Sequence, residues 1–74
     1  MIHIEVIEST EKYDLVKMIS DKENSFNNIH VTSGEIVEKS DKNLTLRLKT
    51  NDAISINGEI YLWWDRGKKV FVRQ

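Results

Sequence analysis

The chain has 74 residues with no cysteine and no proline, and its formal net charge at neutral pH is −1. This length allows one domain, residues 1–74, with a thin core, because so short a chain buries only about 60–65% of its unfolded surface. A hydrophobic content of 39% with 31% charged residues is typical of a folded, soluble domain rather than a disordered one. Residues 1–41 carry nine acidic side chains against four lysines, whereas residues 42–74 carry seven basic side chains against three acidic ones. This asymmetry indicates either a polar partner or an electrostatic match between the two halves.

The N-terminal third predicts a strand followed by a helix. Residues 2–8 alternate in a strand-like pattern. Ser9 and Thr10 can each cap a helix, and residues 11–22 place an apolar stripe at helical spacing. A second strand is the alternative for residues 11–22, since four side chains in that segment also alternate: Tyr13, Leu15, Lys17 and Ile19.

From residue 21 onward the sequence predicts a loop and then strands. Residues 21–28 are polar and turn-rich, and Phe26 is the expected anchor of this loop in the core. Residues 29–38 form the next expected strand, with a bulge or bend at Ser33-Gly34. A turn at residues 40–42 leads to a strand in which Leu44, Leu46 and Leu48 alternate with polar residues.

After a turn at Asn51-Asp52, residues 54–56 form a short strand, and Asn57-Gly58 is a strong hairpin signal. The expected fold is therefore α+β: a curled antiparallel sheet of four to six strands, arranged as a meander and packed against one short helix.

The terminal segment predicts a hairpin with a three-residue loop, Asp65-Arg66-Gly67, and with Gly67 in the left-handed conformation. That register pairs Trp64 with Lys68 and separates aliphatic side chains from aromatic and charged ones. The expected core face contains Ile60, Leu62, Val70 and Val72, and the expected outer face contains Glu59, Tyr61, Trp63, Lys69, Phe71 and Arg73.

The Asn57-Gly58 turn conflicts with this division of faces. A two-residue loop there would place Ile54 and Ile56 on the aromatic side. Either the loop is longer, or the aromatic face is itself partly covered.

No motif for catalysis, cofactor binding or metal binding appears. The two histidines, His3 and His30, have no ligand spacing around them, and the three glycines stand alone. We therefore expect a non-enzymatic protein without a cofactor. The segment at the start has no signal-peptide pattern and no apolar run reaches membrane-spanning length, so we expect a cytoplasmic protein that does not enter a membrane.

The expected binding surface combines aromatic and basic side chains of the terminal hairpin with two cations of the Leu44–Leu48 strand. Interface hot spots favour tryptophan, tyrosine and arginine, which predicts a protein or nucleoprotein partner. A single-stranded nucleic-acid binding module is the alternative, since such modules stack bases on aromatics beside cations. The structural reading is that these aromatics belong to the core. The candidate residues are Arg47, Lys49, Tyr61, Trp63, Arg66, Lys68, Lys69, Phe71 and Arg73.

The spacing of Asn57-Gly58, Gly67-Lys68-Lys69 and the terminal Gln74, with aromatics between them, resembles the C-terminal hairpin of a family of small phage anti-CRISPR proteins. The resemblance covers about a quarter of the chain. It implies a curled antiparallel sheet with one helix, an inhibitor that occupies a functional surface of a host complex, and contact roles for Lys68 and Lys69. A homodimer formed through an unpaired strand edge is a further expectation, because a meander leaves two edges free.

Overall fold

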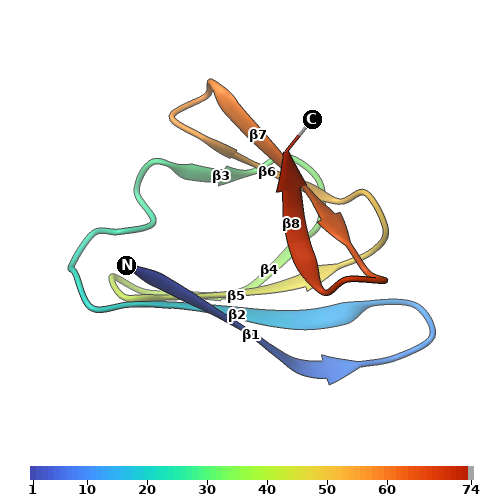
Figure 1. Cartoon of the computed structure of the whole chain (residues 1–74). Coiled ribbons are helices and arrows are strands. Elements are labelled where there is room, and N and C mark those ends of the chain that lie inside the picture. Colours follow the sequence, from blue (N-terminus) through green and yellow to red (C-terminus); the bar gives the residue numbers. More distant parts are fainter. Residues whose placement is uncertain (74) are drawn as a thin grey trace.

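The computed structural model describes residues 1–73 and contains two four-stranded antiparallel sheets, with no helix in that range. The sheets lie across one another and enclose the core between them (Figure 1). The first sheet has the order β1-β2-β5-β4 and the second has the order β3-β6-β7-β8. The strands are β1 (Ile2–Ser9), β2 (Asp14–Ser20), β3 (Ile29–Val31), β4 (Glu35–Lys39), β5 (Asn43–Leu48), β6 (Ala53–Ile56), β7 (Ile60–Asp65) and β8 (Val70–Arg73).

The predicted α+β class is wrong, because the segment expected to be a helix forms β2. In this strand every second residue is buried, beginning with Asp14 and continuing through Val16 and Met18. The expected helix cap has a different role: the Thr10 hydroxyl accepts hydrogen bonds from the backbone N–H groups of Lys12 and Tyr13, both at 3.2 Å, and closes a tight turn. Pairing with strands on both sides thus overrides the local helical pattern.

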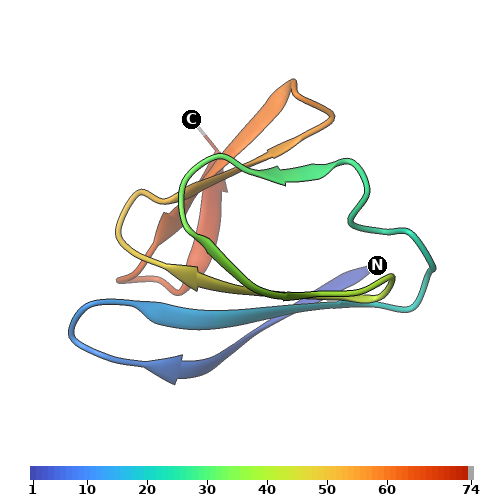
Figure 2. The same cartoon turned by 180° about the vertical axis from the view of Figure 1, so that it is seen from behind.

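The predicted meander is also wrong, because several strands pair with partners distant in sequence. β2 pairs with β5, and β3 pairs with β6. The predicted single strand over residues 29–38 is divided into β3 and β4, which belong to different sheets. Together with β5 and β6 they form one long hairpin that bends from one sheet into the other, as Figure 2 shows from behind.

The bend occurs at the predicted Ser33-Gly34 position and has a clear steric cause. Gly34 has a backbone φ of +118°, which residues other than glycine rarely adopt. A Cβ at this position would also lie 2.7 Å from Cδ2 of the buried Leu48, so only glycine fits at the bend. The N–H groups of Thr32 and Ser33 both donate to the carbonyl of Ala53, which ties the two halves of the bend together.

The core contains apolar side chains from both sheets and one from a loop. As expected, Leu44, Leu46 and Leu48 of β5 point inward, and Phe26 anchors its loop with 1% of its surface exposed. The second sheet contributes Trp64, which is fully buried. The other fully enclosed or nearly enclosed members are Val16, Met18, Ile29 and Ile54.

The terminal hairpin has a register different from the predicted one. Asp65 pairs with Val70 and Trp64 with Phe71, so the loop is Arg66–Lys69. Lys69, with φ +58°, adopts the left-handed conformation that we expected for Gly67. The shift by an odd number of residues turns β8 over relative to β7.

As a result, the side chains of β8 face the opposite way from the prediction. Phe71 packs inward against Trp64 with their ring centres 5.0 Å apart in an edge-to-face arrangement. Val72, predicted for the core face, lies opposite Trp63 on the outer side, and Val70 is 45% exposed.

The conflict at Asn57-Gly58 is resolved by a longer loop. Both residues have positive φ, and Ile56 pairs with Ile60, so the loop spans Asn57–Glu59. Ile54 then lies opposite Leu62 on the core side.

Candidate functional site

A buried carboxylate joins the two sheets next to the terminal hairpin. Asp14, at the start of β2, is completely enclosed. Its Oδ2 accepts a 2.8 Å hydrogen bond from Nε1 of Trp64, and its Oδ1 accepts bonds from Ser9 Oγ at 2.6 Å and Lys69 Nζ at 2.8 Å. Arg66 donates to both carboxylate oxygens at 3.2 Å. We call these five residues the Asp14 cluster.

Arg66 extends the cluster to the turn between β1 and β2. Its guanidinium donates to the backbone carbonyls of Thr10, Glu11 and Tyr13, with distances of 3.0 Å to Glu11 and 3.2 Å to Tyr13. One side chain therefore fixes the β7–β8 loop of the second sheet onto the β1–β2 turn of the first.

The charge state of Asp14 follows from its partners. Burial alone raises the pKa of this carboxyl, but hydrogen bonds from Arg66, Lys69, Ser9 and Trp64 outweigh burial and hold the pKa well below its usual range. The carboxylate is therefore ionised at neutral pH and its oxygens are occupied by donors. We interpret it as a structural anchor rather than as a general base.

This geometry changes the predicted binding surface. Arg66 and Lys69 were expected to present charge to a partner, yet both are bonded to Asp14. Phe71 was expected outside and instead packs on Trp64. Sequence reasoning missed Asp14 itself, because an acidic residue outside the apolar stripe of an expected helix looks like an ordinary surface residue.

Arg47 on β5 is also engaged within the chain. Its guanidinium forms an ion pair with Glu35 at 2.8 Å and lies 5.0 Å from the ring centre of Tyr13. The hydrogen bond and the charge of Glu35 raise the pKa of Arg47. Arg47 faces outward from the first sheet, so it does not extend the surface of the terminal hairpin.

Two of the remaining predicted residues, Tyr61 and Trp63, form an apolar surface on the second sheet. Tyr61 and Trp63 project outward from β7 with their ring centres 6.3 Å apart, and Tyr61 is 44% exposed. Val72 is paired with Trp63 on the same side. We call Tyr61, Trp63 and Val72 the outer aromatic face.

Small residues lie beside the two rings. Ala53 is paired with Trp63 and Ser55 with Tyr61, and these β6 residues are only 7% and 4% exposed. The rings therefore cover part of the sheet and also present their own outer surfaces. The alternation of side chains along β7 was the sequence signal for this arrangement, and it correctly predicted that both rings lie on the outer side of the sheet.

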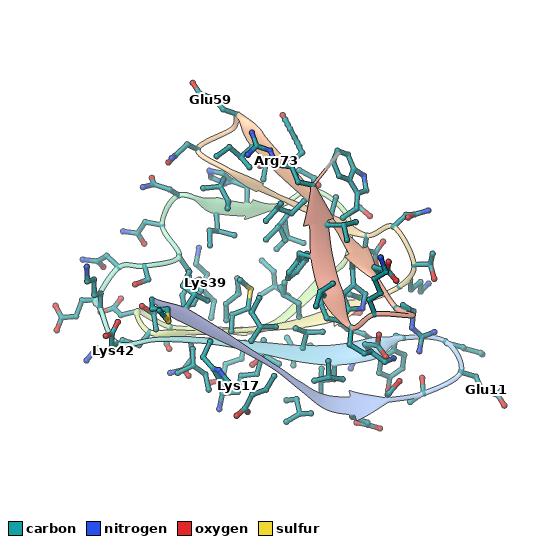
Figure 3. The ribbon with its side chains drawn as sticks, viewed as in Figure 1. Glu11, Lys17, Lys39, Lys42, Glu59 and Arg73 are labelled. Atoms are coloured by element: carbon teal, nitrogen blue, oxygen red, sulfur yellow. The ribbon has the colours of Figure 1, made fainter. Side chains whose placement is uncertain are left out.

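Three of the predicted cations are exposed. Lys68 is exposed in the β7–β8 loop, and Lys49 is exposed in the connection from β5 to β6. Arg73 is exposed near the end of β8, at the opposite end of that strand from the loop (Figure 3). Gln74, the last residue of the resemblance described above, lies outside the described residues.

An apolar groove of about 430 Å³ opens between the two sheets. Ile2 and Ile4 of β1 line it from the first sheet, and Ile56, Leu62 and Phe71 line it from the second. Ile2 and Ile4 point inward yet remain 37% and 39% exposed. The sequence analysis did not predict this groove, because it depends on how two distant strands diverge.

Comparisons with family models, curated proteins and solved structures found no match. Within residues 1–73 no group of three or more His, Cys, Asp or Glu side chains is placed to hold a metal ion. The same part of the chain contains no helix long and apolar enough to span a membrane.

Proposed function

We propose that this chain is a non-enzymatic protein-binding domain that contacts its partner through the outer aromatic face. The observation that carries this proposal is the position of two large aromatic side chains, Tyr61 and Trp63, side by side on the outside of a sheet. Such side chains dominate the energetics of protein interfaces, particularly where they can be desolvated by a complementary surface.

The distribution of charge favours a protein partner over a nucleic acid. A single-strand binder needs cations along the path of the phosphates. In this chain Arg66 and Lys69 neutralise Asp14, Arg47 pairs with Glu35, and the net charge is −1. These contacts within the chain leave Lys49, Lys68 and Arg73 as the exposed cations among the predicted binding residues.

The resemblance of the terminal hairpin to phage anti-CRISPR proteins gives this proposal a biological setting. An inhibitor of this kind would act in the cytoplasm of a host cell and occupy a surface of a host protein complex. Of the two lysines that the resemblance assigns to contact, Lys68 is exposed and Lys69 is bonded to Asp14 and Ser9. We therefore include Lys68, but not Lys69, in the proposed interface.

Replacing Trp63 with alanine is expected to weaken partner binding by roughly 30-fold or more, as the loss of a hot-spot tryptophan costs about 2 kcal/mol or more. Proteins captured from a host lysate by the wild-type chain would be identified by mass spectrometry, and their affinities for purified variants measured by calorimetry. Ile36→Ala is the matched control, because Ile36 is a 49% exposed apolar residue on β4 of the other sheet.

Two outcomes would count against the proposed face. Equal loss of affinity in Trp63→Ala and Ile36→Ala would contradict the proposed face. Retention of a single-stranded DNA or RNA oligonucleotide at low salt, with affinity falling steeply as salt increases, would favour the nucleic-acid alternative. We expect no such retention.

A further inference from the structure

The outer edge of β1 is the longest unpaired strand edge in the described part of the chain. β1 has eight residues and lies at the end of its sheet (Figures 1 and 2). It is exposed at every position except Val6. Three of its apolar side chains, Ile2, Ile4 and Ile7, are more than a third exposed. Unpaired N–H and C=O groups along such an edge are a template for another strand.

The other three sheet edges are shorter than β1. β3 has only three residues, and β8 has four, ending in Arg73. β4 has five, including three charged side chains, and its pairing is interrupted by a bulge. β1 contains no lysine, arginine or proline, the residues that commonly protect edges. Its own irregularity, between Val6 and Glu8, leaves Ile2–Val6 regular.

We propose that β1 pairs with β1 of a second copy, antiparallel and centred on Ile4. In antiparallel pairing, residues directly opposite each other share a face of the sheet. Centring on Ile4 places the two Ile4 side chains opposite each other and each Ile2 opposite the second copy's Val6. These are the side chains that line or adjoin the apolar groove, so pairing covers its exposed rim.

Side-chain pairing favours this register over its neighbours. Centring on Ile4 places His3 opposite the second copy's Glu5, and the same pairing occurs twice by symmetry. Within one chain these two side chains already lie 3.4 Å apart. Centring on Glu5 would oppose two carboxylates, which is unfavourable. Centring on His3 would place the two His3 side chains opposite each other and lose both pairs of His3 with Glu5.

The dimer would leave the proposed interface free. β1 belongs to the first sheet, whereas the outer aromatic face belongs to the second. The inference therefore does not depend on the proposed function, and each copy in a dimer would present its own outer aromatic face to a partner.

Cysteine cross-linking tests the pairing, because the chain has no cysteine of its own. Under mild oxidation Ile4→Cys is expected to form a covalent dimer at least tenfold faster than Ile36→Cys, since residues opposite each other across a symmetry axis approach disulfide distance. Ile36 is the control, being 49% exposed on the opposite edge of the same sheet. Equal rates for the two variants would overturn the proposal.

A mixture of His3→Cys and Glu5→Cys chains tests the register and leaves the groove side chains intact. We expect disulfide-linked heterodimers in clear excess over both homodimers, because residue 3 faces residue 5 of the second copy. Mass spectrometry distinguishes the three products. A statistical mixture, or an excess of Glu5→Cys homodimers, would contradict pairing centred on Ile4.

Discussion

Replacing Asp14 with asparagine is expected to lower the free energy of unfolding by about 3–5 kcal/mol, the usual cost of breaking a buried ion pair. The substitution removes the negative charge that compensates Arg66 and Lys69, and places an amide N–H₂ group among their donors. Urea denaturation at neutral pH would measure the change. Asp41→Asn, in the exposed turn before β5, is the control and should change stability by no more than about 0.5 kcal/mol.

The same carboxylate predicts the direction of the pH dependence. The pKa of Asp14 is lower in the folded chain than in the unfolded chain, so its contribution to stability is fully present above about pH 4 and is lost as the pH falls further. Between pH 6 and 3 the wild-type protein should therefore lose more unfolding free energy than Asp14→Asn does. This pH range includes the pKa of an aspartate carboxyl in the unfolded chain, about 4. Equal slopes for the two proteins would contradict an ionised Asp14 in the folded state.

The two adjacent tryptophans should respond very differently to replacement by alanine. Trp64→Ala is expected to destabilise the fold by about 3–5 kcal/mol, because it leaves a cavity and removes the indole donor of Asp14. Trp63→Ala should cost about 1 kcal/mol, since its ring lies on the outer side of the sheet. Denaturation midpoints of both variants, measured under the same conditions, provide the comparison.

Each tryptophan is the control for the other in size and chemistry. Similar losses of stability in the two variants would mean that both rings belong to the core. The outer aromatic face would then not exist as a binding surface.

The sequence predicted those strands in which apolar and polar side chains alternate regularly. The strand at residues 2–8 and the Leu44–Leu48 strand are both confirmed, because the alternating apolar side chains of each lie on one face of the sheet. The segment at residues 11–22 was misassigned because its apolar residues fit a helical stripe and a strand equally well. Its pairing between β1 and β5 decides in favour of the strand, and no local signal encodes that pairing.

The candidate site was only partly predictable for a related reason. The alternation along β7 correctly placed Tyr61 and Trp63 on the outside. The orientation of β8 depended on loop length, and the four-residue loop is stabilised by contacts of Arg66 and Lys69 with Asp14, more than fifty residues away in sequence. Local turn preferences favoured a shorter loop because they contain no information about this distant carboxylate.

Hydrogen exchange of the two indole N–H groups, observed by NMR, tests most directly whether Trp64 is held inside on Asp14 while Trp63 lies outside. We predict that the Trp64 indole N–H exchanges slowly, as a buried donor to Asp14 opens only when the hairpin unfolds. The Trp63 indole N–H should exchange rapidly. Fast exchange at Trp64 together with protection at Trp63 would contradict the register and, with it, the proposed binding face.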